Sequence, residues 1–411
     1  MKYDVAIIGG GPAGMMSAGR AGELGARVIL LEKNNNLGSK LLITGKGRCN
    51  ITNNTDENRE LIKRFGKNGR FLYSALHKFG VNEIIDFFEK RGVKTKVERG
   101  NRIFPESDKA QDVLDVLINY LKESKVGIKT NAEVKKIIKK DHKIEKIILI
   151  GGREIIADKF VICTGGKSYP ATGSTGDAYK WLKQLGHNII EPRPSLAPVI
   201  AKEKIVKDLE GLSLKNVEIS IFEKGKKIDS RFGEAIFTAD GLSGPIILDL
   251  SKRIGEELPG DIELKIDFKP ALDFKTLDQR VQKDFQERSN KLFRNSLDNL
   301  LPQKIIPVIV KLSKIDSEKK VNLITKEERK RLLHLLKEFT LSVKSLYGYD
   351  KAIITAGGVD LKEVDPQTMK SKIVDNLYFA GEVLDLDGPT GGYNLQVCWS
   401  TGFVAGEGVV D

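Results

Sequence analysis

The chain has 411 residues, of which 40% are hydrophobic and 30% are charged, a composition that excludes a wholly disordered chain and provides cores for two or three domains, or for one domain with an insertion. Its 68 Lys and Arg residues exceed its 56 Asp and Glu residues, and the net charge of +12 favours anionic partners such as nucleic acid, acidic metabolites or phosphorylated cofactors. A Lys-rich composition without such a partner would give the same surplus, so charge alone does not separate the two interpretations.

The first predicted element is a short, buried parallel strand over Val5–Ile8, a run rich in β-branched residues. This run is far too short for the hydrophobic region of a signal peptide, and no stretch of the sequence approaches the ~18 apolar residues that cross a membrane. We therefore expect a cytoplasmic protein.

A GxGxxG motif follows this strand directly, at Gly9, Gly11 and Gly14. Gly9 permits a tight turn, Gly11 lets a pyrophosphate approach the backbone, and Gly14 lets the next helix pack closely on the strand. The helix predicted over residues 15–24 offers free N–H groups and a partial positive charge to the phosphates. The motif therefore predicts a dinucleotide site, and a glycine-rich turn without a ligand is the competing interpretation.

A second strand over Val28–Leu31 ends in Glu32, at the position where a carboxylate accepts hydrogen bonds from a ribose diol. A carboxylate there would repel the 2′-phosphate of NADP. Strand, helix, second strand and acid follow one another in the first 32 residues, and this order strengthens the prediction of a dinucleotide site considerably.

Two later segments favour FAD over NAD. A strand over 159–163 runs into a Thr-Gly-Gly turn, and a strand over 376–380 runs into Gly381 and Glu382, followed by a glycine-rich turn and a helix to about residue 405. Flavoproteins of the glutathione reductase type place an acid after such a strand to hold the ribityl chain. They direct the next helix at the flavin pyrimidine, where free amides stabilise the anion formed on reduction.

The predicted FAD site uses both ends of the chain, so the middle must be inserted. No second GxGxxG followed by an acid is present, so we expect no dedicated NAD(P)H domain, and electrons would come from transiently bound NAD(P)H or from the substrate itself. In the middle of the chain, apolar and polar residues alternate over 214–222 and 261–268, and this pattern predicts two strands. Two capping boxes, Thr276 to Gln279 and Thr325 to Glu328, predict amphipathic helices, the first ending at Leu301-Pro302.

The segment 311–337 contains nine basic and four acidic residues, a net charge of +5. A basic helical insertion beside a flavin suits a large polyanionic substrate. A solvated helix face with Glu–Lys pairs gives the same pattern. The residues predicted to contact RNA are Lys311, Lys314, Lys319, Lys320, Arg329, Lys330 and Arg331.

Five segments complete a pattern that resembles the YhiN/BaiN-like family of flavoproteins, also known as aminoacetone-oxidase-like. They are residues 41–53, 166–177, 237–245, 355–359 and 391–396. The resemblance implies tightly bound FAD and an α/β fold: a Rossmann-like domain of the glutathione reductase type over 1–194 and 346–411, an inserted β-rich part over 195–270 and a basic helical part over 271–345. One departure is Cys398-Trp399, where the family usually has a small residue.

The resemblance leaves the substrate open. Members of the family resemble amine oxidases, reductases of conjugated steroid enones, and flavoenzymes that reduce a uridine of ribosomal RNA to dihydrouridine. Our leading hypothesis is an FAD-dependent reductase of an electron-poor C=C bond, with ribosomal RNA uridine as substrate. The alternatives are a small-molecule flavin oxidase or reductase acting on an amine or enone, and a flavin-binding redox sensor without turnover.

Several residues are candidates for chemistry. Arg48 could bind phosphate or stabilise the reduced flavin anion, and Cys49 could protonate a carbon after hydride transfer, although a buried packing residue is the competing interpretation. Tyr169 and Tyr393 could flank the flavin or donate a proton. Lys40 could neutralise the pyrophosphate or be a solvated surface residue.

The candidate catalytic residues are Cys49 and Tyr393. The three cysteines, Cys49, Cys163 and Cys398, are far apart, and we predict no metal site. The predicted cofactor-binding residues are Gly9, Gly11, Pro12, Ala13, Gly14, Glu32, Lys33, Lys40, Gly47, Arg48, Cys49, Asn50, Val134, Thr164, Gly165, Gly166, Gly381, Glu382, Gly391, Gly392, Asn394, Leu395 and Gln396.

Overall fold

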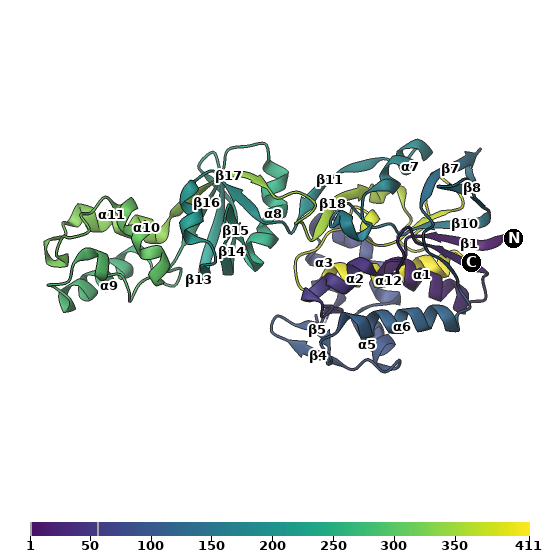
Figure 1. Ribbon diagram of the computed structural model, residues 1–411, viewed down its shortest axis with the longest axis horizontal. Coiled ribbons are helices and arrows are strands. Elements are labelled where there is room, and N and C mark those ends of the chain that lie inside the picture. Colours follow the sequence, from purple (N-terminus) through teal and green to yellow (C-terminus); the bar gives the residue numbers. More distant parts are fainter. Residues whose placement is uncertain (1, 56) are drawn as a thin grey trace. The chain divides into compact units, whose positions relative to one another are not determined.

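The computed structural model describes residues 2–55 and 57–411. Residues 1 and 56, which belong to the predicted Rossmann-like domain, lie outside the described residues. The chain divides into two compact units, Met1–Pro194 with Ala352–Asp411, and Ser195–Lys351 (Figure 1). The first unit contains both ends of the chain, and the second is one continuous insertion.

A five-stranded parallel sheet organises the first unit, in the order β19-β10-β1-β2-β6. This sheet and the helices that cover it confirm the predicted Rossmann-like α/β class. Three predicted strands lie at its centre, and their apolar runs are buried as expected. The strands are β1 (Tyr3–Ile8), β2 (Val28–Leu31), β6 (Gly127–Lys129), β10 (Ala157–Ile162) and β19 (Leu377–Phe379).

Helices α1 (Pro12–Glu23) and α12 (Tyr393–Gly408) come from opposite ends of the sequence and lie side by side (Figure 1). Small residues allow this close packing, because a Cβ added to Gly402 would lie 2.6 Å from the carbonyl oxygen of Ala13. Trp399, the departure from the family pattern, is fully buried and donates a hydrogen bond to the carbonyl oxygen of Ile51 at 2.9 Å. The large side chain is thus accommodated in the core next to the segment that precedes β3.

Smaller sheets and helices complete the first unit. The strands form sheets in the orders β3-β5-β4, β7-β8-β9 and β11-β18. Their bounds are β3 (Thr52–Asn53), β4 (Thr95–Glu98), β5 (Arg102–Pro105), β7 (Val134–Lys140), β8 (Lys143–Leu149), β9 (Glu154–Ile155), β11 (Ile189–Ser195) and β18 (Ile354–Val359). The helices are α2 (Ser39–Ile43), α3 (Asn58–Lys63), α4 (Tyr73–Lys78), α5 (Val81–Glu89), α6 (Ala110–Glu123) and α7 (Asp177–Leu185).

The second unit contains a closed barrel in the strand order β12-β15-β14-β13-β16-β17. The predicted strands over 214–222 and 261–268 are confirmed as β13 and β16. Buried residues alternate along β16, and a register shift between Leu214 and Val217 interrupts the alternation along β13. The bounds are β12 (Val199–Ala201), β13 (Ser213–Glu223), β14 (Lys226–Phe237), β15 (Gly241–Ser243), β16 (Ile262–Asp267) and β17 (Phe339–Leu346).

Four helices accompany the barrel, and they share one hydrophobic cluster with it. Three of them, α9 to α11, lie between β16 and the last barrel strand, β17, so this helical segment leaves the barrel after β16 and returns beside it. The finer division of this unit at residue 270 stays a prediction. The helices are α8 (Pro245–Glu257), α9 (Phe274–Glu287), α10 (Ile306–Ser313) and α11 (Lys326–Lys337).

The two capping boxes have different outcomes. Thr325 caps α11 and exchanges hydrogen bonds with Glu328, which confirms the second box. The first box is wrong, because Asp273 is the N-cap of α9 and accepts a hydrogen bond from the Thr276 amide at 2.7 Å. The acidic side chain three residues earlier satisfies the free amide, and the helix ends at Glu287, well before residue 301.

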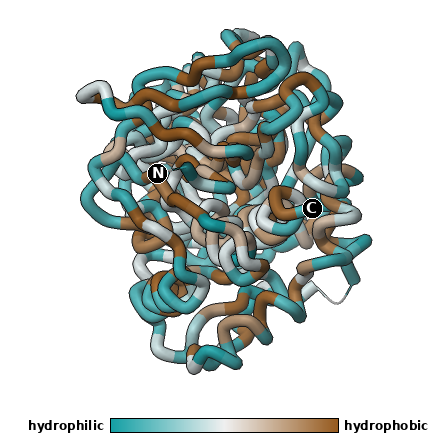
Figure 2. Tube along the Cα trace, turned by 90° about the vertical axis from the view of Figure 1, so that its right-hand side faces the viewer, coloured by the Kyte–Doolittle hydropathy of each residue, from teal (hydrophilic) through white to brown (hydrophobic). Residues whose placement is uncertain are grey.

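Hydrophobic stretches alternate with hydrophilic turns along the trace (Figure 2). Among the described residues, no helix combines the length and the apolar character that crossing a membrane requires. No group of three or more His, Cys, Asp or Glu side chains in this part of the chain is arranged to hold a metal ion.

Candidate functional site

The glycine motif adopts the geometry that its spacing predicts. Gly9 has a φ of +105°, and a Cβ there would lie 2.4 Å from the carbonyl oxygen of Cys163. A Cβ on Gly14 would lie 1.9 Å from the carbonyl oxygen of Gly9, so only glycine lets α1 approach β1 this closely. At Gly11, by contrast, no atom lies within 4 Å of the Cβ position. The open face at the α1 N-terminus fits a pyrophosphate, with Pro12 and Ala13 forming the first helical positions.

Glu32 lies at the end of β2 and is buried, with 9% of its surface exposed. Its carboxylate accepts hydrogen bonds from the amides of Gly10 and Asn34, both at 2.8 Å. The side chain therefore organises the glycine turn itself, and its binding of a ribose diol stays a prediction. Val134, at the start of β7, is buried two residues after Ala132, whose amide donates to the carbonyl oxygen of Glu32 at 2.8 Å.

Lys40 joins the two halves of the predicted site. Its ammonium group lies 2.7 Å from the Glu382 carboxylate and 2.5 Å from the Ser168 hydroxyl. Glu382 also accepts hydrogen bonds from Ser168 and from the Thr355 amide, at 3.0 and 2.8 Å. Lys40 is thus a half-buried ion-pair partner rather than a solvated surface residue. Lys33 is engaged in the same way, with Asp177 at 2.7 Å.

Two buried polar atoms have no hydrogen-bond partner in the described chain and belong to the predicted cofactor motifs. They are Oδ1 of Asn50 and Oγ1 of Thr164. Buried polar atoms are rarely left unsatisfied, so both atoms fit a site that a polar group completes. Thr164 immediately precedes Gly165 and Gly166, and a Cβ on Gly166 would lie 2.4 Å from the Thr355 hydroxyl oxygen, which leaves room only for glycine.

The turn before α12 is held by its own polar side chains. Asn394 accepts a hydrogen bond from the Gly388 amide at 2.8 Å and donates to the Gly388 carbonyl oxygen at 3.0 Å. Gln396 is fully buried, accepts from the Thr52 hydroxyl at 2.5 Å and donates to Ser400 at 2.9 Å. Gly392, with a φ of +100°, is the N-cap, and Leu395 is half-buried in the first turn. The first-turn amides of α12 thus keep their free N–H groups and partial positive charge.

The side chains of Arg48 and Cys49 are less accessible to a ligand than their motif suggests. The Arg48 guanidinium pairs with Glu98 and Asp108 and stacks 4.1 Å above the Phe104 ring. Cys49 lies two residues after Gly47 and is fully buried, and this burial raises the pKa of its thiol to about 12. A neutral, enclosed thiol suits packing. The phosphate-binding role of Arg48 and the proton-donor role of Cys49 stay predictions.

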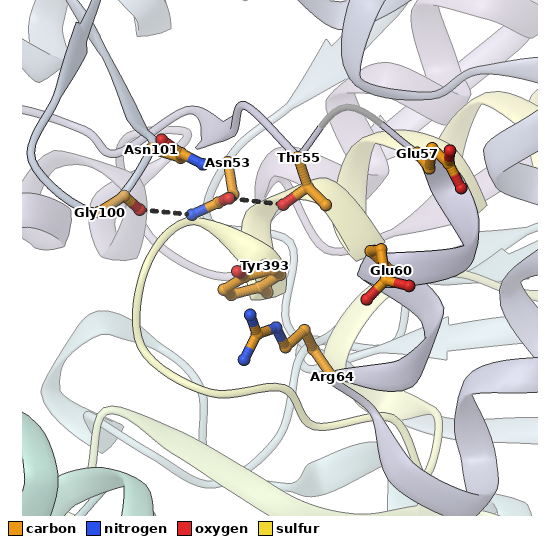
Figure 3. Close-up of a pocket in the computed structure, with 8 residues that line it drawn as sticks. All are labelled: Asn53, Thr55, Glu57, Glu60, Arg64, Gly100, Asn101 and Tyr393. Atoms are coloured by element: carbon orange, nitrogen blue, oxygen red, sulfur yellow. Dashed lines mark hydrogen bonds between the residues drawn. The ribbon is translucent and has the colours of Figure 1, made fainter. Parts of the chain in front are cut away.

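A cavity of about 520 Å³ opens beside the N-terminus of α12 (Figure 3). Of the candidate residues, Tyr393 reaches it, and its ring packs edge-on against Phe65 at 6.4 Å between centroids. Sequence reasoning missed the remaining lining residues, because they come from two separate segments and carry no motif apart from Asn53. The lining consists of Asn53, Thr55, Glu57, Glu60, Arg64, Gly100, Asn101 and Tyr393.

Comparison with known proteins agrees with this geometry. A family model described as the HI0933-like protein Rossmann domain matches residues 3–408. The 3-dehydro-bile acid delta(4,6)-reductase of Clostridium scindens is 32% identical over 417 aligned residues, which cover 99% of each chain. The ribosomal RNA dihydrouridine synthase of Escherichia coli is 30% identical over 412 residues, which cover 100% of this chain and 98% of that relative.

Solved structures share the fold at low identity. A 3-ketosteroid delta1-dehydrogenase from Sterolibacterium denitrificans superimposes with a TM-score of 0.54 at 12% identity, covering 99% of both chains. A flavocytochrome c3 fumarate reductase in its open conformation gives a TM-score of 0.53 at 16% identity, covering 99% of this chain and 78% of the other. These similarities show the fold alone.

The glycine turn, the acid after β2 and the α12 turn, together with the family match and the full-length relatives, define the protein as an FAD-dependent oxidoreductase with a Rossmann-like FAD-binding domain. The chain belongs to the HI0933-like family, which is the YhiN/BaiN family that the sequence motifs resemble. Enzymatic turnover is thereby favoured over the sensor hypothesis.

Proposed function

We propose that this enzyme reduces an electron-poor C=C bond and that its leading substrate is a uridine of ribosomal RNA. The observation that carries this proposal is the full-length similarity to two relatives whose names both describe addition of hydrogen to a C=C bond. In dihydrouridine formation, the bond reduced is C5=C6 of the uracil ring. NAD(P)H is the proposed electron donor.

Some residues of the site would bind the cofactor and substrate, and others would stabilise charge. The open face at Gly11 and the α1 N-terminus would hold the FAD pyrophosphate, and Glu32 would bind the adenosine ribose. FAD supplies hydride chemistry when bound. The first-turn amides of α12 would stabilise negative charge at the pyrimidine edge of the flavin, and the cavity beside Tyr393 would admit the substrate.

We predict that the flavin, reduced anaerobically by NADPH or NADH, is reoxidised by the C=C substrate faster than by buffer alone. Ribosomal RNA from cells that lack the gene and a 3-keto-Δ4 steroid would be compared directly, because each matches one relative's name. Reoxidation by RNA supports uridine, and reoxidation by the steroid alone supports the small enone. Flavin that amines reduce and only oxygen reoxidises would contradict a reductase.

The basic insertion supports RNA as the substrate, but fewer of its cations are available to bind RNA than the sequence predicted. Lys319 pairs with Glu328 at 2.8 Å, and Arg329 pairs with Asp278 at 2.6 Å, so both stabilise the helices. The Arg331 Nε donates to the Ser313 carbonyl oxygen at 3.1 Å, at the C-terminal end of α10. Of the seven residues predicted to contact RNA, four are exposed lysines without an ion pair in the described chain and are free to contact phosphates: Lys311, Lys314, Lys320 and Lys330.

Replacement of these four lysines by Ala is expected to weaken RNA binding and to reduce the slope of log K against log salt by up to about 3, since each phosphate contact on a single strand contributes ~0.7. Binding is measured by salt titration with unchanged FAD content. A matched variant at four exposed lysines of the other unit, Lys122, Lys125, Lys135 and Lys143, controls for net charge. Equal slopes in the two variants would count against this surface.

A further inference from the structure

The cavity beside α12 has a rigid frame. Asn53 donates hydrogen bonds to the carbonyl oxygens of Gly100 and Gly391, at 3.1 and 3.0 Å, and accepts one from Thr55 at 2.7 Å (Figure 3). This side chain thereby joins β3, the turn between β4 and β5, and the turn before α12. Because both polar ends of its amide are engaged, Asn53 positions the walls and leaves substrate contacts to its neighbours.

Arg64 is the cation of this cavity, and its side chain is directed toward the Tyr393 ring (Figure 3). It follows α3, and the next residue, Phe65, is buried against Tyr393, which fixes the backbone at this point. The part of the chain that the structure describes provides no hydrogen-bond or ion-pair partner for the guanidinium. The neighbouring acid Glu60 is instead paired with Lys63. Arg64 thus presents unused N–H donors to the cavity.

The charges of the lining decide which substrate group these donors suit. Glu57 and Glu60 line the same cavity as Arg64, so the three side chains together carry no positive surplus for an anion. A neutral carbonyl oxygen, by contrast, gains a charge-assisted hydrogen bond from the guanidinium without meeting net repulsion. The Tyr393 hydroxyl, which has no hydrogen-bond partner in the described chain, is a second donor lining the cavity.

We propose that Arg64 is a catalytic residue that binds the carbonyl oxygen conjugated to the substrate's C=C bond. This inference rests on the proposed reductase function. Hydride from the reduced flavin adds to the β-carbon, and the π pair of the C=C bond shifts to form an enolate whose negative oxygen faces Arg64. A proton from water then adds to the α-carbon, so the substrate gains two electrons and two hydrogens. In uracil, hydride reaches C6, the proton reaches C5, and the enolate oxygen is O4.

The first experiment compares Arg64→Met with Arg64→Lys and with Arg59→Met, a control at an exposed arginine of α3 outside the cavity. Loss of one donor to a developing oxyanion slows chemistry by ~10²–10³-fold. We therefore expect Arg64→Met to slow reoxidation by the C=C substrate to this extent, while reduction by NADPH and reoxidation by oxygen stay unchanged. Arg64→Lys should recover part of the rate, and Arg59→Met should match the wild type.

A second readout needs no turnover. The oxidised holoenzyme is titrated with 4-nitrophenol, whose phenolate resembles the enolate and is followed by its absorbance. Arg64→Met should raise the pH at which the bound phenol ionises, because the cation that favours the phenolate is gone. Wild-type flavin that no C=C substrate reoxidises would defeat the proposed function while leaving this titration intact. Active wild type with unchanged rates and an unchanged phenol titration in Arg64→Met would overturn the inference itself.

Discussion

Replacement of Gly11 by Val is expected to yield a folded protein that no longer retains FAD. Gly11 has an extended backbone with a φ of −81°, which Val adopts without strain, and no atom lies within 4 Å of the Cβ position. The added methyl groups would instead occupy the space that the pyrophosphate needs. We expect affinity for FAD to fall at least ~100-fold, about 2.7 kcal/mol.

The measurement is the flavin absorbance of the purified protein, with FAD titrated back into the apoprotein. Far-ultraviolet circular dichroism reports whether the fold is retained. Gly11→Ala, which adds a single methyl group, should fall between the wild type and Gly11→Val. A Val variant that purifies with a full complement of FAD would show that the cofactor phosphates lie elsewhere.

Replacement of Gly14 by Ala is expected to act on the fold rather than on the cofactor site, with loss of stability as its primary effect. A Cβ at Gly14 would lie 1.9 Å from the Gly9 carbonyl oxygen and 3.3 Å from the Cys163 Cβ, so α1 must move away from the sheet. Ala is favoured over Gly inside a helix by ~1 kcal/mol, so propensity alone predicts stabilisation. We expect the clash to dominate and to destabilise the apoprotein by at least ~3 kcal/mol.

Urea denaturation of the apoprotein measures this difference without a contribution from FAD binding. Gly11→Ala is the matched control, since it adds the same methyl group three residues earlier, where space is open. A Gly14→Ala protein as stable as this control would mean that α1 tolerates displacement. Together the two positions separate a glycine needed by the ligand from a glycine needed by the fold.

Local patterns predicted the frame of the site well. The run Val28–Leu31 became β2 with the same bounds, and each glycine of the GxGxxG motif has the environment that its position implies. These features depend on neighbours within a few residues or on one tight turn. The capping of α9 shows the limit even here, because Asp273 competes with Thr276 for the same role and the pattern alone does not rank them.

Contacts between distant segments were not predictable in this way. The ion pair of Lys40 with Glu382 joins residues 342 positions apart, and neither residue type indicates its partner. Arg64 lies in a charged helical stretch whose composition is ordinary, and its place in a cavity depends on the turn at Gly100 and on Tyr393. The positions of these side chains depend on how the whole first unit folds around α12.

The order of the strands has a consequence for synthesis on the ribosome. Strand β10 pairs with β1 on one side and with β19 on the other, yet the whole inserted unit is translated between β10 and β19. The inserted unit is continuous in sequence and can complete its barrel first. Until residue 379 has emerged, β10 is an exposed edge of a parallel sheet, and α1 has no α12 to cover it. The nascent chain therefore carries an open strand edge and an uncovered apolar helix face for most of its synthesis, the condition in which sheet proteins depend on chaperones.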